Sequence, residues 1–290
     1  MGWRTVVVNT HSKLSYKNNH LVFQTGIQTE MIHLSEIDSI ILETTNISIT
    51  SMLIKRLVDE KINLVFCDDK ALPLANLMPF YGRYNNSLEF KKQIDWAQEK
   101  KEEVWMEVLR QKLINQSRLL FKREKDDQGK RIEEFSCQIE RNDPTNREAH
   151  AARLYFNTLF GLPFSRQEET DINAGLNYGY SLLLSIFARE IVLNGCRTEL
   201  GLMHHSQLNN FNLASDLMEP FRVLVDEIVL ENQEEKFKQI KKAILALVQN
   251  TYPYKGQRSY LTNIISDYVR NMIQVLNNES EKLPEFIYEL

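Results

Sequence analysis

A short polar stretch, residues 201–221 (GLMHHSQLNNFNLASDLMEPF), concentrates side chains that can ligate a cation. His204 and His205 are adjacent, and Asp216 and Glu219 follow three residues apart, which places them on one face of a helical turn. Pro220 must break, kink or begin a helix there. Imidazole together with carboxylate suits Mn²⁺ and tolerates Mg²⁺. A histidine is more often a surface or core residue than a metal ligand. If this stretch does bind a metal, we expect it to supply only half of the ligands, and the other half must come from elsewhere in the chain.

A candidate for the other half is Glu148, in the segment PTNREAHAARLYFNTLF. Asp143 and Pro144 are typical of a helix start, with an N-cap acid and proline at the first helical position. Ala152, Tyr155 and Leu159 define the expected inward stripe, on which Glu148 also falls. A carboxylate on an apolar face is costly unless it is paired or binds metal. The alternatives are a partner arginine or a stripe drawn slightly wrongly.

Composition indicates a soluble globular protein, with 43% hydrophobic and 26% charged residues among 290. The net charge of −4 argues against a broadly basic nucleic-acid binder. The seven basic residues of segment 141–230 are all arginine, whose planar fork suits phosphate. Carboxylates with arginines fit a metal site that handles phosphates, and ordinary surface ion pairs explain the same composition equally well.

The cysteines and the short apolar runs favour a location in the cytoplasm. Cys67, Cys137 and Cys196 form neither a metal spacing nor a disulfide framework, which favours a reducing cytoplasm. The first ten residues contain only a short apolar run, unlike a signal peptide. No run approaches the roughly 18 apolar residues of a membrane span.

The chain changes character after residue 80. Residues 1–80 read as short strands, with a hairpin over 13–25 around Asn18-Asn19 and a helix over 51–62. Residues 81–87 read as a linker. The expected fold is α+β: a β-sandwich-like domain over 1–80, then a larger all-α domain over 88–290. Its expected helices lie within 88–123 and from Pro144, with a turn at 122–130, followed by helices over 169–193, 213–231, 234–250 and 258–277.

Five ordered motifs give the chain a resemblance to a known family. They are GWRTVVVN at the start, REAHAARLYF around Glu148, NAGLNYGY at 173–180, GLMH at 201–204 and DLMEPFR at 216–222. Together they resemble the CRISPR spacer-acquisition integrase over essentially the whole chain. The variant that the chain resembles accompanies type II systems with a single large RNA-guided nuclease.

This resemblance implies a ligand set, a fold and a reaction. It assigns Glu148, His204 and Glu219 as catalytic metal ligands for Mg²⁺ or Mn²⁺, with Asp216 in support. A one-residue shift would replace His204 by His205, although the spacing from Gly201 favours His204. The implied fold is an N-terminal β-sandwich with a helical C-terminal domain. In the implied reaction, a 3′-OH of a foreign DNA fragment attacks a phosphodiester at the CRISPR array, without ATP.

The resemblance also implies partners. These are double-stranded DNA, as spacer precursor and CRISPR repeat, a second copy of the chain bound mainly through the N-terminal domain, and a small ferredoxin-like CRISPR protein that bridges two dimers. Other adaptation proteins and the RNA-guided nuclease of the same prokaryotic system are further candidate partners. For contacts to the DNA backbone we expect Arg222, Arg147, Arg197, Lys255 and Arg258, with the tyrosines of segment 254–260 stacking on bases.

Two other functions fit the same residues. The first is a metal-dependent endonuclease or phosphodiesterase that acts on branched DNA, with water in place of the 3′-OH. The second is a non-enzymatic nucleic-acid scaffold, in which the acids and histidines are structural.

Overall fold

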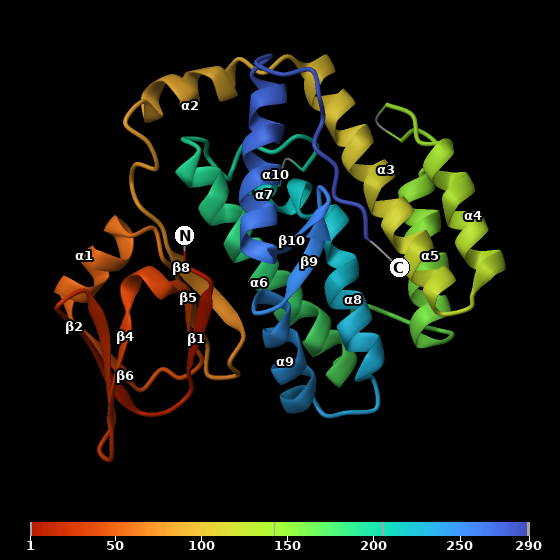
Figure 1. The fold of residues 1–290 in the computed structure, drawn as a ribbon. Helices are drawn as coiled ribbons and strands as arrows, with labels where there is room; N and C mark the ends of the chain where they lie inside the picture. The colour runs from red at the N-terminus through yellow and green to blue at the C-terminus, as the bar shows by residue number, and fades with distance from the viewer. Residues whose placement is uncertain (1, 142, 205, 289–290) are drawn as a thin grey trace.

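The computed structural model describes residues 2–141, 143–204 and 206–288, and it confirms the α+β class, with strands first and helices after them (Figure 1). One helix, α1 (Ser51–Asp59), and one 3-10 turn, η1 (Leu34–Glu36), interrupt the strands. The strands of this part are β1 (Arg4–Val8), β2 (Ser12–Lys17), β3 (His20–Gln24), β4 (Thr29–His33), β5 (Ile37–Leu42), β6 (Ile47–Ile49), β7 (Asn63–Cys67) and β8 (Pro73–Leu77).

These strands form two four-stranded sheets. One has the order β1-β5-β7-β8 and the other the order β4-β3-β2-β6. The hairpin expected over 13–25 is confirmed as β2 and β3, which pair antiparallel. Asn18 and Asn19 form its turn with φ values of 48° and 61°, the left-handed conformation that a two-residue hairpin turn requires. Leu14, Leu21 and Leu53 are fully buried between the sheets and α1.

The first sheet also packs against the helical part of the chain. Ile41 and Val65 belong to the same apolar core as the helices. Asn63 Nδ2 donates to Ser185 Oγ at 3.2 Å, and an Arg189 guanidinium N–H donates to the Asp38 carbonyl oxygen at 3.1 Å. The sheet therefore holds the helices through buried polar contacts as well as through apolar packing.

The helical part is built around α6, which is buried along most of its length. No helix within the described ranges is long and apolar enough to cross a membrane. The elements of the helical part are α2 (Asn86–Ile94), α3 (Gln98–Lys122), α4 (Asp126–Cys137), α5 (Arg147–Phe160), α6 (Asp171–Leu193), α7 (Asn212–Leu217), η2 (Glu219–Phe221), α8 (Arg222–Glu231), α9 (Phe237–Leu245), η3 (Ala246–Val248), β9 (Thr251–Tyr254), β10 (Gln257–Tyr260) and α10 (Leu261–Leu276).

Two expected boundaries in this part were wrong. The turn expected over 122–130 contains the start of α4 at Asp126. The helix expected from residue 258 begins at Leu261, because residues 257–260 pair with β9 as a hairpin. Lys255 and Gly256 form its turn with positive φ, and the helical part is consequently not all-α. The interruption expected at Pro220 is confirmed, because the helical stretch expected over 213–231 is divided there into α7, η2 and α8.

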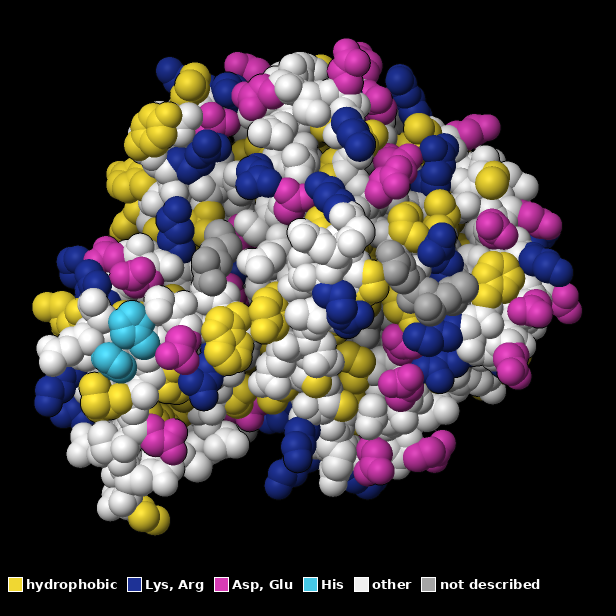
Figure 2. All heavy atoms as spheres, viewed as in Figure 1, with side chains coloured by type: hydrophobic (Ala, Val, Ile, Leu, Met, Phe, Trp, Pro, Cys, Tyr) yellow, Lys and Arg dark blue, Asp and Glu magenta, His cyan; other side chains and the backbone are white. Residues whose placement is uncertain are grey.

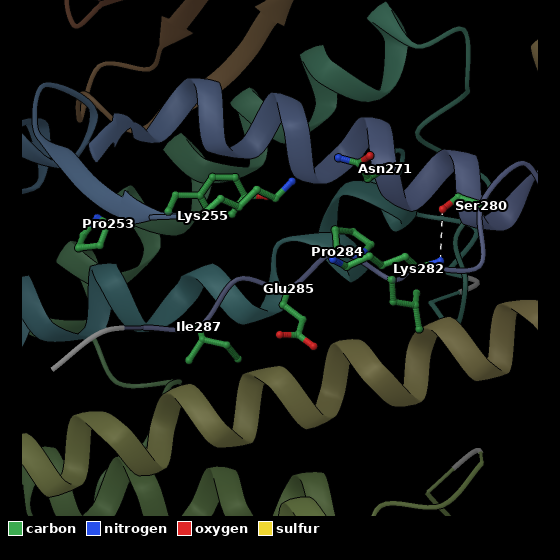
Figure 3. A pocket seen from close by; sticks show the side chains of 10 residues that line it. Pro253, Lys255, Asn271, Ser280, Lys282, Pro284, Glu285 and Ile287 are labelled. Atoms are coloured by element: carbon green, nitrogen blue, oxygen red, sulfur yellow. Dashed lines mark hydrogen bonds between the residues drawn. The ribbon is translucent and has the colours of Figure 1, made fainter. Parts of the chain in front are cut away.

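The C-terminal segment 282–288 lies along α3 in an extended form. Asn115 holds it by donating to the Phe286 carbonyl oxygen at 2.9 Å and accepting from the Tyr288 backbone N–H at 2.8 Å. The same amide donates to the Pro220 carbonyl oxygen at 2.8 Å. A hollow of about 560 Å³ lies between this segment, the β9–β10 hairpin and α10, with Lys255 and Lys282 among its lining residues (Figure 3).

Replacing Asn115 by alanine is therefore expected to destabilise both the C-terminal segment and η2. The loss leaves buried backbone groups without partners, at about 2–4 kcal/mol of unfolding free energy. Urea denaturation measures the change. Gln98→Ala, an exposed amide on the same helix, is the control and should shift the midpoint little. Equal stability of Asn115→Ala and wild type would contradict the account of this segment.

Candidate metal centre

Glu148 lies in the first turn of α5, whose start differs from the expectation. The helix begins at Arg147 rather than at Pro144. Asp143 still caps it, because its two carboxylate oxygens accept the backbone N–H groups of Arg147 and Glu148, both at 2.9 Å. The cap thus fixes the backbone of Glu148 itself, which is the residue whose side chain carries the chemistry.

The inward stripe of α5 is Ala151, Tyr155 and Leu159, so the expected Ala152 was one position off. Glu148 lies three residues before Ala151, on the same face of the helix. Its side chain is one-third exposed at 33%, at the edge of the interface between α5 and α3. A carboxylate at this edge can keep contact with solvent while meeting a partner on α3.

Asp216 is fully buried in α7 and organises the loop that carries His204. Its carboxylate accepts the backbone N–H groups of Leu202 at 2.6 Å and Met203 at 3.1 Å. It also contacts Nδ1 of His204. This contact raises the pKa of the His204 imidazole, against the effect of partial burial. Asp216 therefore acts on His204 rather than facing Glu219, three residues further along the chain.

The glycine and asparagines of this stretch shape the same loop. A Cβ on Gly201 would lie 2.4 Å from the His204 carbonyl oxygen and 2.8 Å from Asp216 Oδ2, so only glycine fits there. Asn212 Nδ2 donates to the carbonyl oxygens of Glu199 and Ser206, both at 3.0 Å. The amide nitrogen of Asn212 therefore ties the two ends of the loop together.

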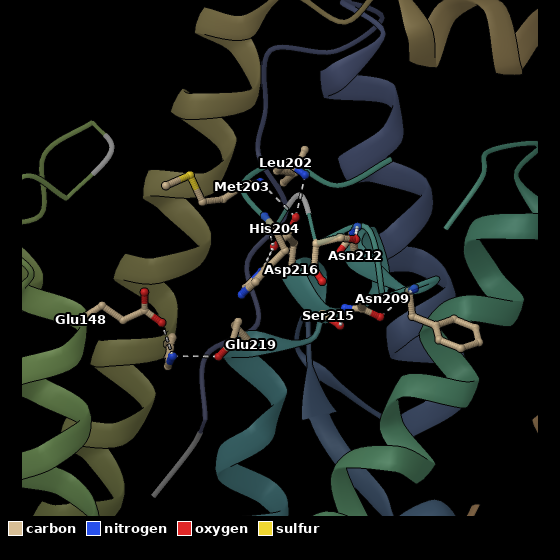
Figure 4. Close-up of polar contacts among 12 residues, drawn as sticks. Glu148, Leu202, Met203, His204, Asn209, Asn212, Ser215, Asp216 and Glu219 are labelled. Atoms are coloured by element: carbon tan, nitrogen blue, oxygen red, sulfur yellow. Dashed lines mark hydrogen bonds and ion pairs between the residues drawn. The ribbon is translucent and has the colours of Figure 1, made fainter. Parts of the chain in front are cut away.

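Glu148 and Glu219 converge on one ammonium group, that of Lys112 in α3. Lys112 Nζ lies 2.7 Å from Glu148 Oε1 and 2.8 Å from Glu219 Oε2. Figure 4 shows the two glutamates pointing toward each other from α5 and η2, with dashed lines meeting between them. Residues 71 positions apart in sequence thus share a cationic partner from a third element.

The charges at this point are balanced. Burial alone would lower the pKa of Lys112, but Glu219 and Glu148 outweigh it and raise that pKa. Burial would raise the pKa of Glu219, but Arg222 and Lys112 together hold it below its usual range. Arg222 lies 2.8 Å from Glu219 Oε1. Two carboxylates and two cations leave the group near neutral, with Glu219 ionised.

A buried network behind Arg222 keeps it in place. Its guanidinium lies over the Tyr180 ring, 4.9 Å from the centroid. Tyr180 and Tyr155 donate from their hydroxyls to the two oxygens of Asp226, at 2.5 and 2.9 Å. Burial raises the pKa of Asp226 to about 6. The network links Tyr155 on the stripe of α5 to the arginine that holds Glu219.

The donors present fit a divalent cation, but not in their present positions. Among the described residues, no three histidine, cysteine or acidic side chains are close enough to hold a metal together. Glu219 Oε2 is buried and, despite the ion pair with Lys112, lacks a hydrogen bond within the described part of the chain. The bridging ammonium shows that the two carboxylates form a place for positive charge. His204 presents Nε2, because Nδ1 faces Asp216.

The arginines expected to contact DNA lie in different surroundings. Arg222 lies in the site, on Glu219. Arg147 and Arg197 lie over aromatic rings, Arg147 5.5 Å from the centroid of Phe135 and Arg197 5.9 Å from that of Phe90. His205 lies outside the described residues.

Lys255 and Arg258 lie on the β9–β10 hairpin, where each has an intramolecular partner. Lys255 pairs with Asp267 at 2.5 Å, and Arg258 Nε donates to Thr251 Oγ1 at 3.0 Å. Tyr254 donates to Asp267, and the Tyr260 ring stacks on Trp3. Contact with DNA would therefore have to be shared with these existing partners.

Sequence reasoning missed Lys112, although a signal for it exists. The run LRQKLINQS in α3 places Gln111, Asn115, Gln116 and Ser117 among apolar residues, and all four are buried. So many polar side chains on the inner face of one helix indicate a helix that serves a polar site as well as the core. Lys112 lies within this run.

Comparison with known proteins agrees with the fold and the motifs. Residues 5–246 match the family model described as CRISPR associated protein Cas1. A CRISPR-associated endonuclease Cas1 of Neisseria meningitidis is 35% identical over 236 residues, which covers 81% of this chain and 77% of that protein. One from Pyrobaculum aerophilum is 29% identical over 242 residues, covering 78% of this chain and 80% of that protein.

Solved structures show the same fold at lower identity. A casposase bound to integration product has a TM-score of 0.79 at 20% identity, over 98% of this chain and 94% of that one. A Cas6-RT-Cas1–Cas2 complex has a TM-score of 0.75 at 16% identity, over 95% of this chain and 35% of that one.

The chain belongs to the Cas1 family of CRISPR-associated proteins. The resemblance expected from the five motifs is thereby confirmed. The expected function, endonuclease and integrase of the CRISPR system, holds for this chain at the level of the family.

Gly201→Ala is expected to displace the loop and to lower stability by about 1–3 kcal/mol, because the new Cβ overlaps backbone. Thermal unfolding measures this loss. Gly26→Ala is the matched control, since a Cβ there meets nothing within 4 Å. A Gly201→Ala protein as stable as Gly26→Ala would show that Asp216 does not hold the loop as described.

Proposed function

We propose that this chain catalyses metal-dependent DNA strand transfer, joining the 3′ ends of short DNA duplexes to a CRISPR array. The observation that carries the proposal is the convergence of Glu148 and Glu219 on one cation position. The contact of Asp216 with Nδ1 raises the pKa of the His204 imidazole, and the charges of both glutamates also raise it. Membership of the Cas1 family supports a role in the CRISPR system, and the two facing carboxylates support metal-dependent chemistry at this site.

Glu148, Glu219 and Nε2 of His204 would hold a Mg²⁺ or Mn²⁺ ion. When bound, such an ion polarises a phosphoryl oxygen and stabilises a leaving oxygen. Arg222 keeps Glu219 ionised and positioned, and Asp216 keeps His204 in one tautomer. Lys112 and Arg222 provide the positive charge that attracts the phosphate diester to a site lined by acids.

The reaction conserves phosphodiester bonds. A bond forms between the donor 3′-oxygen and phosphorus as the bond from phosphorus to a 3′-oxygen of the array breaks. The proton of the attacking hydroxyl leaves to solvent, and the departing 3′-oxygen gains one. No ATP is needed, because one phosphodiester replaces another.

DNA binding is expected to come largely from an assembly. The chain has a net charge of −4, and Figure 2 shows basic and acidic side chains mixed over the face in view rather than one basic field. Titles of the solved relatives name a Cas1–DNA complex and a Cas1–Cas2 complex. For this chain we propose a homodimer formed through the N-terminal sheets, with a small ferredoxin-like CRISPR protein bridging two dimers.

The second candidate function is hydrolysis of DNA by the same site, with water as the nucleophile. It is favoured by the word endonuclease in the names of the curated relatives. The two functions differ in their need for a free 3′-OH on a donor duplex. A purely structural role for the site is excluded if substitution of its carboxylates abolishes chemistry in a folded protein.

Glu148→Gln and Glu219→Gln are each expected to lower the strand-transfer rate by about a hundredfold or more, because a ligand matters at least as much as its supporting residues. The assay mixes a labelled duplex, a supercoiled plasmid with a repeat array, the small partner protein and Mn²⁺ or Mg²⁺. Glu134→Gln, which removes an exposed carboxylate paired with Arg131, is the control.

Three results would change the proposal. Transfer that survives Glu148→Gln would place the chemistry elsewhere. Plasmid nicking that ignores a donor blocked at its 3′ ends would favour the endonuclease. Wild-type protein that binds the DNA but yields no more product than a reaction without protein, with binding unchanged in both glutamine variants, would favour the scaffold.

A further inference from the structure

A lysine occupies the position between the two carboxylates of the candidate metal centre. Lys112 Nζ is within 2.8 Å of both Glu148 and Glu219, and its side chain is only 11% exposed. A divalent cation held by the same two carboxylates must displace this ammonium or share oxygens with it. Two cations this close repel strongly, so Lys112 and the metal compete for one place.

We propose that Lys112 couples metal binding to DNA binding at this site. The lysine holds the carboxylates together in the metal-free protein and lowers its affinity for divalent cations. When a DNA phosphate arrives, the displaced ammonium gains a new anionic partner, and the metal then binds more tightly. This inference rests on the metal centre of the proposed function.

The surroundings of Lys112 indicate that its ammonium group would move away from the carboxylates when a metal binds, and would not lose its proton. The two carboxylates beside it are held from other elements: Asp143 fixes the backbone of Glu148 at the start of α5, and Arg222 pairs with the side chain of Glu219. The lysine itself has a long flexible stem and no further hydrogen-bond partner among the contacts found in the described residues. It is therefore the member of the group that can move while the carboxylates stay in place.

Coupling of this kind is reciprocal. If DNA raises the affinity for metal through Lys112, then metal must raise the affinity for DNA by the same factor. A site with this property stays largely unloaded until its substrate is bound. In an enzyme that cuts and joins DNA, the metal site would then become loaded mainly after DNA has bound, and not in the free protein.

The test is a titration of the full-length chain with Mn²⁺, read from the electron paramagnetic resonance signal of free Mn²⁺, with and without a short duplex that carries 3′-OH ends. Lys112→Met is expected to bind Mn²⁺ about tenfold more tightly than wild type without DNA, because the competing charge is gone. The duplex should tighten Mn²⁺ binding clearly in wild type and little in Lys112→Met.

Three further variants complete the design. Lys122→Met is the matched control, since this lysine is on the same helix but pairs with Glu227 at 3.0 Å. It should behave like wild type. Lys112→Gln repeats the test if the methionine variant does not fold. Glu219→Gln reports whether the Mn²⁺ measured is bound at this site.

The results separate the two proposals. Lys112 variants that bind Mn²⁺ no more tightly than wild type overturn the role of Lys112 while leaving the metal centre intact. A wild-type protein that takes up no Mn²⁺ with or without DNA, or as much as Glu219→Gln, overturns the metal centre itself. Tighter binding by the Lys112 variants, with loss of the DNA effect, supports the coupling.

Discussion

Two ionised carboxylates that face each other at close range repel unless a cation lies between them, and in this protein α3 supplies that cation. Glu148 and Glu219 come from different helical segments, and a cation between them offsets the repulsion of the two ionised carboxylates. Lys112 provides that charge from α3. The convergence of α3, α5 and η2 is therefore an electrostatic requirement as well as a packing arrangement.

Helix α3 carries both the charge and the support for it. Lys112 meets the glutamates, while Asn115, one turn further along, holds the Pro220 carbonyl oxygen and the C-terminal segment. Pro220 follows Glu219 directly, and its inability to continue a helix produces the η2 turn that aims Glu219 at α3. Phe286 of the C-terminal segment stacks on Phe221 at 3.9 Å, which closes the other side of this turn.

Much of the fold and part of the candidate site could be predicted from the sequence, and the parts that could not be predicted have physical causes. The β2–β3 hairpin follows from two asparagines between alternating segments, and the break at Pro220 follows from proline chemistry. Motif resemblance gave Glu148, His204 and Glu219 as a set. The spacing of these residues alone could not identify them as one site, because no local sequence pattern shows that α5 and η2 lie close together in the fold.

The errors also have local explanations. The start of α5 was placed at Pro144, whereas Asp143 caps from four residues before Arg147 through a left-handed Asn146. The β9–β10 hairpin was not expected, and residues 258–260 of β10 fell within the helix expected over 258–277, because this short polar segment lacks alternating apolar residues. Lys112 was missed because a lysine in a long charged helix is usually solvated, and only the buried amides around it indicate otherwise.

The most direct test of the account is the location of Mn²⁺ in crystals of this protein soaked in the metal, found from its anomalous scattering. The account predicts one strong peak within bonding distance of oxygens of Glu148 and Glu219 and of Nε2 of His204, with Lys112 displaced from Glu219. Metal bound elsewhere, with Lys112 still bridging the two glutamates, would contradict it.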